Sequence, residues 1–230
     1  MGHNVTKAIL LVGSALILAG EAQAQYRHGP GGQFGISFTA ADARGDLAGA
    51  IDQGFGLQLN AGIPLAGDGH LRLRLDGGFM IYGLEHIDYC EFSCRVLTEL
   101  TTTNSILFAG VGPELVLARG DIQPYVFGTA GATWFVTTSS IDYNDGYGPT
   151  DQTTNYSDHT IGFRYGGGIR FGAMNKVAVD LGVTRHDNGV VSYLTRGDIV
   201  DNPDGTVTMF PTQSEADLLS FQVGVSIGIH

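Results

Sequence analysis

The chain has 230 residues, a formal charge of -11 and a sequence pI near 4.8. This charge argues against a nucleic-acid-binding protein, which would carry a basic patch. Lys7 and Lys176 are the only lysines, so the lysine-rich surface that normally keeps a soluble domain hydrated is missing. The 35 glycines follow no collagen period and fall inside alternating segments, which suits a tightly packed β structure better than a disordered chain.

The N-terminus has the organisation of a secretion signal. Lys7 precedes an apolar run over 8–19, and the Ala-Gln-Ala at 22–24 is a small-x-small cleavage site. The apolar run is too short to span a bilayer as a helix. We therefore expect residues 1–24 to be a cleavable signal peptide and residues 25–230 to form the mature domain. The alternative is an uncleaved membrane anchor.

Eight later segments alternate between apolar residues and small or polar residues, which is the period of a β-strand. They cover residues 33–39, 54–65, 71–82, 104–118, 122–137, 161–171, 177–183 and 217–230. The first, for example, places Phe34, Ile36 and Phe38 on one face. The segment 122–137 is partly apolar on both faces, so its facing stays open.

The connections between these segments alternate in length. Long polar stretches follow the first, third, fifth and seventh segments, at 40–53, 83–103, 139–159 and 186–216. Short turns follow the second, fourth and sixth, at 66–70, 119–121 and 172–176. Bacterial outer-membrane barrels keep short turns in the periplasm and long loops outside. The sequence thus predicts an all-β, eight-stranded antiparallel up-and-down transmembrane β-barrel in the bacterial outer membrane.

The hairpin over 161–183 indicates which face points outward. Phe163 and Leu181 lie on bulky apolar faces, whereas Arg164 and Asp180 lie on faces made mostly of glycine. The lumen of a narrow barrel needs a small, sparsely charged lining, and a barrel in lipid is apolar outside. We therefore predict that the apolar faces meet lipid and that the glycine-rich faces point inward.

The chain resembles the small outer-membrane β-barrels of the OmpA-transmembrane, OmpX and opacity-protein kind, from about residue 33 to residue 230. The residues that carry the resemblance are Gly110-Val-Gly-Pro-Glu-Leu, Gln123-Pro-Tyr-Val-Phe-Gly, Gly166-Gly-Gly-Ile-Arg-Phe and the terminal strand. That strand ends in Ile229-His230, where the family usually has Phe or Trp. The resemblance implies the same eight-stranded fold and the same membrane.

Seven charged residues share the glycine-rich faces: Arg72, Arg74, Asp76, Glu114, Arg164, Arg170 and Asp180. A lumen too narrow to hydrate them requires each to be paired and hydrogen-bonded. Arg170 is expected diagonally across the hairpin from Asp180, within reach of its side chain. We expect a lumen ion network that acts as a structural plug, because side chains just fill an eight-stranded interior. The alternative is a gate or ion path.

Cysteine and histidine residues suggest two further sites. Cys90 and Cys94 share a predicted outer loop, and in an exported protein the expectation is a local disulfide. His86 is spaced four residues before Cys90, so a zinc site is the alternative. His186 invites comparison with lipid A deacylases, but Ser192 is the nearest downstream serine, and a hydrolase needs nucleophile, base and orienting group together.

The outer loops are acidic, with Asp142, Asp145, Asp151, Asp158, Asp198, Asp201 and Asp204. We interpret these as solvated charges, with weak Ca²⁺ binding as the alternative, and expect no cofactor and no metal site. The sequence predicts a non-catalytic barrel with a structural or surface-interaction role. Its expected partners are outer-membrane lipid and lipopolysaccharide, with surface partners reached through the loops. The alternatives are a lipid A-modifying enzyme, a small-solute porin and a secreted soluble barrel with reversed facing.

Overall fold

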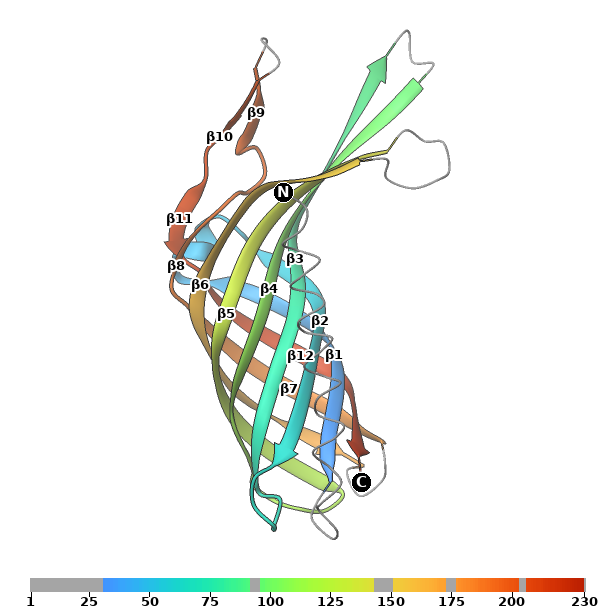
Figure 1. Ribbon diagram of the computed structural model, residues 1–230, viewed down its shortest axis with the longest axis vertical. Helices are drawn as coiled ribbons and strands as arrows, with labels where there is room; N and C mark the ends of the chain where they lie inside the picture. Colours follow the sequence, from blue (N-terminus) through green and yellow to red (C-terminus); the bar gives the residue numbers. More distant parts are fainter. Residues whose placement is uncertain (1–30, 92–95, 143–150, 173–176, 203–205, 230) are drawn as a thin grey trace. The chain divides into compact units, whose positions relative to one another are not determined.

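The computed structural model of the chain describes residues 31–91, 96–142, 151–172, 177–202 and 206–229 (Figure 1). These residues belong to one compact unit that begins at Gly31. The predicted signal peptide, 1–24, lies outside them. No helix in this described part is long and apolar enough to cross a membrane.

Eight strands form a closed antiparallel barrel in the order β1-β12-β7-β6-β5-β4-β3-β2. Their bounds are Gly32–Arg44 (β1), Gln53–Pro64 (β2), Leu71–Glu91 (β3), Val96–Val116 (β4), Ile122–Asp142 (β5), Asp151–Phe171 (β6), Val177–Asn188 (β7) and Asp217–Ile229 (β12). The first and last strands close the ring, with Phe34 opposite Ile227. The predicted eight-stranded antiparallel barrel is confirmed.

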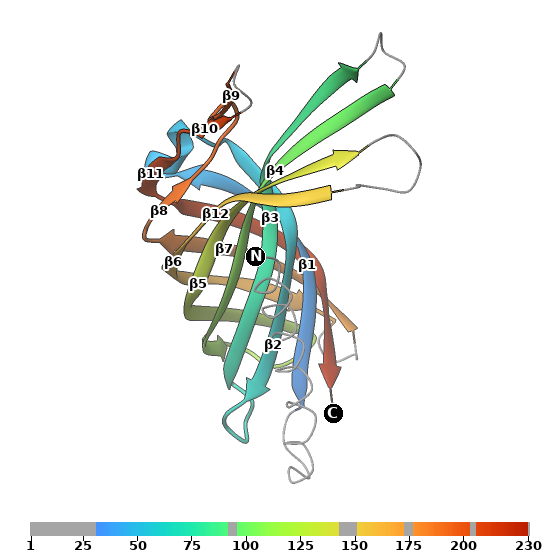
Figure 2. The ribbon, with the colours of Figure 1, turned by 45° about the horizontal axis from the view of Figure 1, so that its top comes forward.

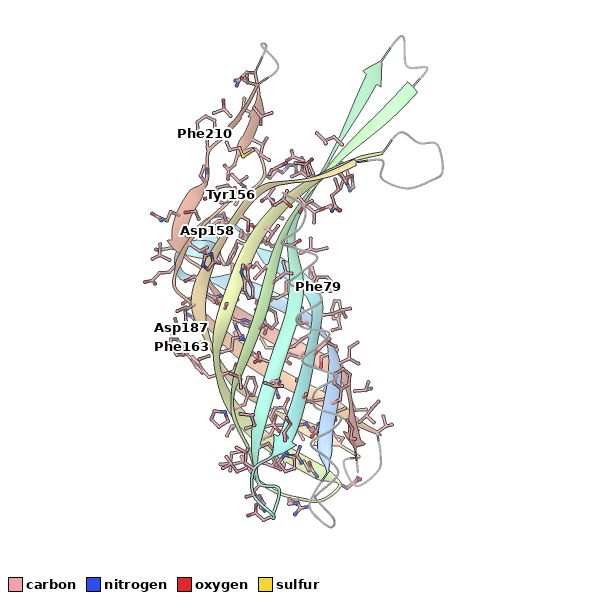
Figure 3. All side chains as sticks on the ribbon, in the orientation of Figure 1. Phe79, Tyr156, Asp158, Phe163, Asp187 and Phe210 are labelled. Atoms are coloured by element: carbon pink, nitrogen blue, oxygen red, sulfur yellow. The ribbon has the colours of Figure 1, made fainter. Side chains whose placement is uncertain are left out.

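The predicted facing of the strands is also confirmed. Phe163 and Leu181 are 58% and 43% exposed, whereas Arg164 and Asp180 are buried. Phe79 and Phe163 point away from the barrel wall (Figure 3). On β5, whose facing the sequence left open, Tyr125 and Phe127 point inward and are buried. The barrel therefore carries an apolar belt on its outside and a mixed, mostly polar interior.

Four strands run well beyond the rest of the barrel. The register of β2 with β3 ends at Phe55 and Ile81, but β3 continues with β4 as far as Glu91 and Val96. Similarly, β6 leaves β7 at Gly162 and Asn188 but continues with β5 as far as its pairing of Asp151 with Ile141. The strand segments 83–91, 96–104, 137–142 and 151–156 thus form a four-stranded upper sheet above the rim (Figures 1 and 2).

This upper sheet corrects the predicted loops at 83–103 and 139–159. These stretches show no strand signal in the sequence, because apolar alternation is required only where one face meets lipid. Threonine, which is frequent in both stretches, nevertheless favours strands through its branched side chain. Polar strands above the belt were therefore mistaken for loop.

The two remaining long connections also contain regular structure. The first holds the short 3-10 helix η2 (Gly45–Gly49). The last contains two small hairpins, in which β8 (Val190–Tyr193) pairs with β11 (Thr212–Glu215) and β9 (Ile199–Asp201) pairs with β10 (Val207–Met209). Both connections lie at the same end of the barrel as the upper sheet (Figure 2).

We predict that Leu181→Arg destabilises the folded barrel by about 2–4 kcal/mol, because an arginine on the lipid face near the bilayer centre loses its hydration. The measurement is reversible urea unfolding in phospholipid vesicles. Val207→Arg is the matched control, since Val207 is similarly exposed, at 51%, but lies on the β10 hairpin. Equal effects of the two substitutions would contradict the assignment of the belt to lipid.

Candidate functional site

Five charged side chains gather in the lumen near the short turns, and all are buried. We call Arg72, Arg74, Glu114, Arg170 and Asp180 the lower ion cluster. Glu114 is its centre, because Arg74 donates to Oε2 at 2.8 Å and Arg170 donates through both terminal nitrogens at 2.9 Å. Arg72 Nη1 lies 3.7 Å from Oε1 of the same carboxylate. One carboxylate therefore faces three guanidinium groups.

Arg170 also holds the second carboxylate of the cluster. It donates from Nε to Asp180 Oδ2 at 3.3 Å, and Tyr125 donates from its hydroxyl to Asp180 Oδ1 at 2.8 Å. The register makes Arg170 and Asp180 direct cross-strand partners, which corrects the diagonal placement expected from the sequence. A turn over 172–176 would pair Phe171 with Val177. The structure pairs Phe171 with Val179, so the connection between paired residues is two residues longer than predicted.

Aromatic rings complete the surroundings of these arginines. The Cζ of Arg170 lies 3.9 Å from the centroid of the Tyr125 ring, and that of Arg74 lies 4.0 Å from the centroid of Phe127. A guanidinium over an aromatic face is stabilised by the ring quadrupole, most strongly where water is excluded. The two inward aromatics of β5 therefore support the cluster as well as filling space.

A second ion pair lies higher in the lumen. Arg164 donates from Nε to Asp76 Oδ2 at 2.9 Å, and both side chains are fully buried. The pair links β6 to β3, which are not neighbours in the barrel. Gly110 leaves the space that this arginine occupies, because a Cβ at that position would collide with the guanidinium. The structure thus divides the seven predicted residues between this pair and the lower ion cluster.

The outer mouth of the lumen is filled by apolar side chains. We call this group the apolar plug: Ala41, Ala43, Leu47, Ile51, Met80, Ile106, Phe108, Phe135, Val191, Tyr193, Ala216 and Leu218. Phe135 contacts Tyr193 of β8 with ring centroids 5.7 Å apart, so the last connection packs into the barrel opening. Leu47 of η2 is fully buried in the same group. The sequence did not indicate this plug, because its members come from connections without periodicity and from inward positions among apolar neighbours.

Hydrogen bonds and an ion pair fasten the last connection across the mouth. The Tyr82 hydroxyl donates to the Leu194 carbonyl at 3.2 Å, and Arg196 lies 3.6 Å from Glu85. On the opposite side, the Ser192 backbone N–H donates to Asp158 Oδ2 at 2.8 Å (Figure 3 labels Asp158). This hydrogen bond lowers the pKa of the Asp158 carboxyl below its ordinary value.

His186 has a serine partner that sequence reasoning missed. Its Nε2 lies 3.0 Å from the Ser220 hydroxyl on the neighbouring strand β12, and both side chains are buried inside the barrel. Ser192, the candidate from the sequence, instead uses its backbone to bind Asp158. The ring of Phe108, a member of the apolar plug, meets the His186 ring edge-on with centroids 5.2 Å apart. His186 is paired with Leu218, and Ser220 faces inward two residues further along the same strand, β12. The sequence could have suggested this contact only if the order and register of β7 and β12 had been known.

Two predicted sites lie outside what the structure describes. Cys94 falls in the segment 92–95 and the side chain of Cys90 is not described, so the predicted disulfide and the alternative zinc site stay predictions. Among the described residues, no group of three or more histidine, cysteine, aspartate or glutamate side chains could hold a metal ion.

A closed barrel with an apolar exterior, a plugged interior and long connections at one end matches a known family. The model of the outer membrane protein beta-barrel domain matches residues 8–227. The chain belongs to this family. It is therefore a protein of the bacterial outer membrane. Bacterial outer-membrane barrels in general keep their short turns in the periplasm and their long loops outside.

Solved structures of other outer-membrane proteins are similar to this barrel. Ail, the attachment invasion locus protein of Yersinia pestis, is 11% identical, with 87% of this chain and 99% of Ail covered and a TM-score of 0.46. Neisserial surface protein A is 14% identical, with 86% and 97% covered and a TM-score of 0.42. A major outer membrane protein from Thermus thermophilus is 11% identical, with 86% and 99% covered and a TM-score of 0.46. None of the curated proteins matches the chain.

We predict that Glu114→Gln destabilises the barrel by about 3–5 kcal/mol, because it removes the carboxylate that three buried guanidinium groups share. Urea unfolding in phospholipid vesicles measures the change. Glu215→Gln is the control, since Glu215 is exposed on β11 and its substitution should alter stability by less than about 0.5 kcal/mol. A wild-type free energy of unfolding for Glu114→Gln would mean that the cluster contributes no net stability.

We predict that the contact between β6 and β8 weakens only in strong acid. A carboxyl whose pKa is lowered in the folded chain contributes stability above its unfolded pKa and loses it as the pH falls through the folded value. The Ser192 amide proton shift should therefore titrate with a midpoint below 3.8, the ordinary value for this carboxyl. Asp158→Asn should remove that titration. A midpoint at or above 3.8 would contradict the hydrogen bond.

Proposed function

We propose that this protein is a sealed outer-membrane barrel that contacts positively charged partners at the cell surface through its acidic outer end. The barrel interior is filled, so its role is to anchor and present the upper sheet. The apolar belt would contact membrane lipid, and the outer end would meet lipopolysaccharide and surface partners.

The distribution of charge carries this proposal. The outer segments 45–52, 83–104, 137–156 and 189–216 contain thirteen carboxylates and two arginines, a net charge of -11. This equals the formal charge of the whole chain, so the remaining residues sum to zero. Such one-sided charge raises the association rate of oppositely charged partners and disfavours partners of like charge. The partner class that fits is a basic protein or peptide.

The upper sheet supplies a second means of contact. Beyond Ile81 on β3 and before Gly162 on β6, each strand has left its barrel neighbour, so the sheet has two outer edges. Backbone groups at a sheet edge can pair with an added strand, and side chains then select which strand is accepted. The β3 segment 83–91 contains Glu85, Asp88 and Glu91 but no lysine or arginine, so it favours a basic strand.

The filled interior opposes a porin role. The lower ion cluster, the Arg164–Asp76 pair and the apolar plug lie one above another in the lumen. Water and ions would have to displace paired charges at two levels and then pass Phe135 and Tyr193. Eight-stranded barrels are wide enough for side chains but leave little room beside them.

The position of His186 opposes a lipid-modifying enzyme. Its bond to Ser220 resembles a base with a nucleophile, but both groups lie in the lumen, on the side of the wall away from the lipid. The apolar plug covers them from the outside. An acyl chain in the membrane could not reach the serine oxygen, so we assign the pair a packing role.

Two reconstitutions of the same protein test the two parts of the proposal, the sealed lumen and the acidic contact surface. The full-length protein, reconstituted into planar bilayers of zwitterionic phospholipid, should add no conductance steps. In vesicles of the same lipid it should bind poly-lysine, with an affinity that falls as salt rises. Replacing Glu85, Asp88, Glu91 and Glu99 with their amides should weaken this binding at least tenfold.

A matched variant gives the control. Amides at Asp198, Asp201, Asp204 and Glu215 remove the same charge from the last connection, and should weaken binding less than the upper-sheet variant does. If both variants lose the same poly-lysine affinity, binding depends on the total charge of the outer end and not on the upper sheet. Regular conductance steps from the wild-type protein would overturn the sealed lumen.

A further inference from the structure

The lower ion cluster lacks one negative charge. It holds three guanidinium groups, from Arg72, Arg74 and Arg170, and two carboxylates, from Glu114 and Asp180. All five are buried, and even Arg72, the most exposed, is only 7% accessible. Arginine does not lose its proton in proteins. The cluster therefore carries a net charge of about one positive unit in a place where an uncompensated charge is costly.

Four nitrogen donors in this part of the lumen are left without partners. They are Nε of Arg72, Nε and Nη2 of Arg74, and the amide Nε2 of Gln33. The carboxylate acceptors are already used, because both oxygens of Glu114 bind arginines and both oxygens of Asp180 are bonded to Tyr125 or Arg170. The hydroxyl of Thr129, which is also unpartnered, can accept a hydrogen bond but carries no charge. The cluster thus lacks both a negative charge and hydrogen-bond acceptors for its free donors, and a bound anion would supply both.

Arg72 and Gln33 border one glycine, and Arg74 is paired with the same glycine on the neighbouring strand. Gln33 on β1 and Arg74 on β3 are the register partners of Gly62 on either side, and Arg72 donates to the side-chain carbonyl oxygen of Gln33. A Cβ on Gly62 would meet Arg72 Cδ at 3.4 Å and Gln33 Cβ at 3.9 Å, so the missing side chain leaves room between them. We propose that Gln33, Arg72 and Arg74 bind a small monovalent anion of the halide class beside Gly62.

The ion pair higher in the lumen shows why water alone does not suffice here. Around Arg164 and Asp76, the unpartnered atoms include acceptors, namely Asp76 Oδ1 and Gln58 Oε1, as well as donors. The charges of that pair also cancel. Buried water can bridge such a mixed set. In the lower ion cluster water could occupy the donors but could not neutralise the third guanidinium.

The size of the anion follows from the surroundings. Carboxylates, aromatic rings and the barrel wall enclose the arginines on all but the turn side, where Arg72 retains its slight exposure. A halide can enter there and accept several N–H bonds at once. Gluconate, with its chain of hydroxylated carbons, is too large and serves as the non-binding anion in the test.

Thermal unfolding of the full-length protein in zwitterionic detergent tests the proposal. The midpoint is measured in sodium chloride, sodium bromide and sodium gluconate at equal ionic strength. Binding to the folded state alone should raise it by about 3–5 °C for each tenfold increase in halide above the dissociation constant. Gluconate should give no such rise. Arg72→Gln, which restores equal numbers of charges, should abolish the halide effect.

Two further measurements keep the result decisive. Arg119→Gln removes a cation from the exposed turn at the same end and should keep the full halide response. Crystals of the wild-type protein soaked in bromide should show an anomalous peak between Gln33, Arg72 and Arg74, which tests the site even if Arg72→Gln does not fold. Equal midpoints in halide and gluconate, or a bromide-free site at saturating bromide, would overturn the proposal.

Discussion

The ion pairs that cross the lumen are the contacts on which the rest of this barrel depends. Arg164 joins β6 to β3 and Arg170 joins β6 to β4, so each pair spans strands that share no backbone hydrogen bonds. Once these charges are buried, each requires its partner, because a lone ion in the lumen would cost several kcal/mol. The inner glycines follow from the same requirement, since an eight-stranded interior has room for a guanidinium only where the facing residue has no side chain.

The sequence identified which residues face inward but revealed only part of their pairing. Strict alternation placed Arg74, Glu114 and Arg170 on one side of their strands, and a narrow lumen required them to pair. Only Arg170 and Asp180, in one hairpin, could be matched from local order. Arg164 and Asp76 are 88 residues apart, and the tilt and stagger of the closed ring decide that they meet. Those quantities depend on all eight strands together, and no single segment contains them.

The apolar plug and the upper sheet could not be predicted from the sequence, and the reason is different for each. Alternation gives facing only where one side is polar, and Ile106 and Phe108 stand beside the outward Leu107 in a stretch that is apolar throughout. Leu47 and Tyr193 come from connections with no period at all, and only the mouth of the barrel brings them together. The upper sheet was not predicted because its strands lie in water and need no apolar face, so their sequences show no alternation. Lipid imposes the pattern that sequence reasoning detects, and beyond the lipid that pattern ends.

The acidic charge at the outer end also resolves a hazard that the fold creates. An outer-membrane protein is held at high local concentration with its outer edges in one plane, and open sheet edges tend to pair with identical edges of neighbouring copies. Here the β3 segment 83–91 contains Glu85, Asp88 and Glu91, the β6 segment 151–156 contains Asp151, and neither segment contains lysine or arginine. Two copies that approach edge to edge bring like charges together, which disfavours that pairing. Under the function proposed above, the same carboxylates would both disfavour pairing between identical edges and favour the addition of a basic strand.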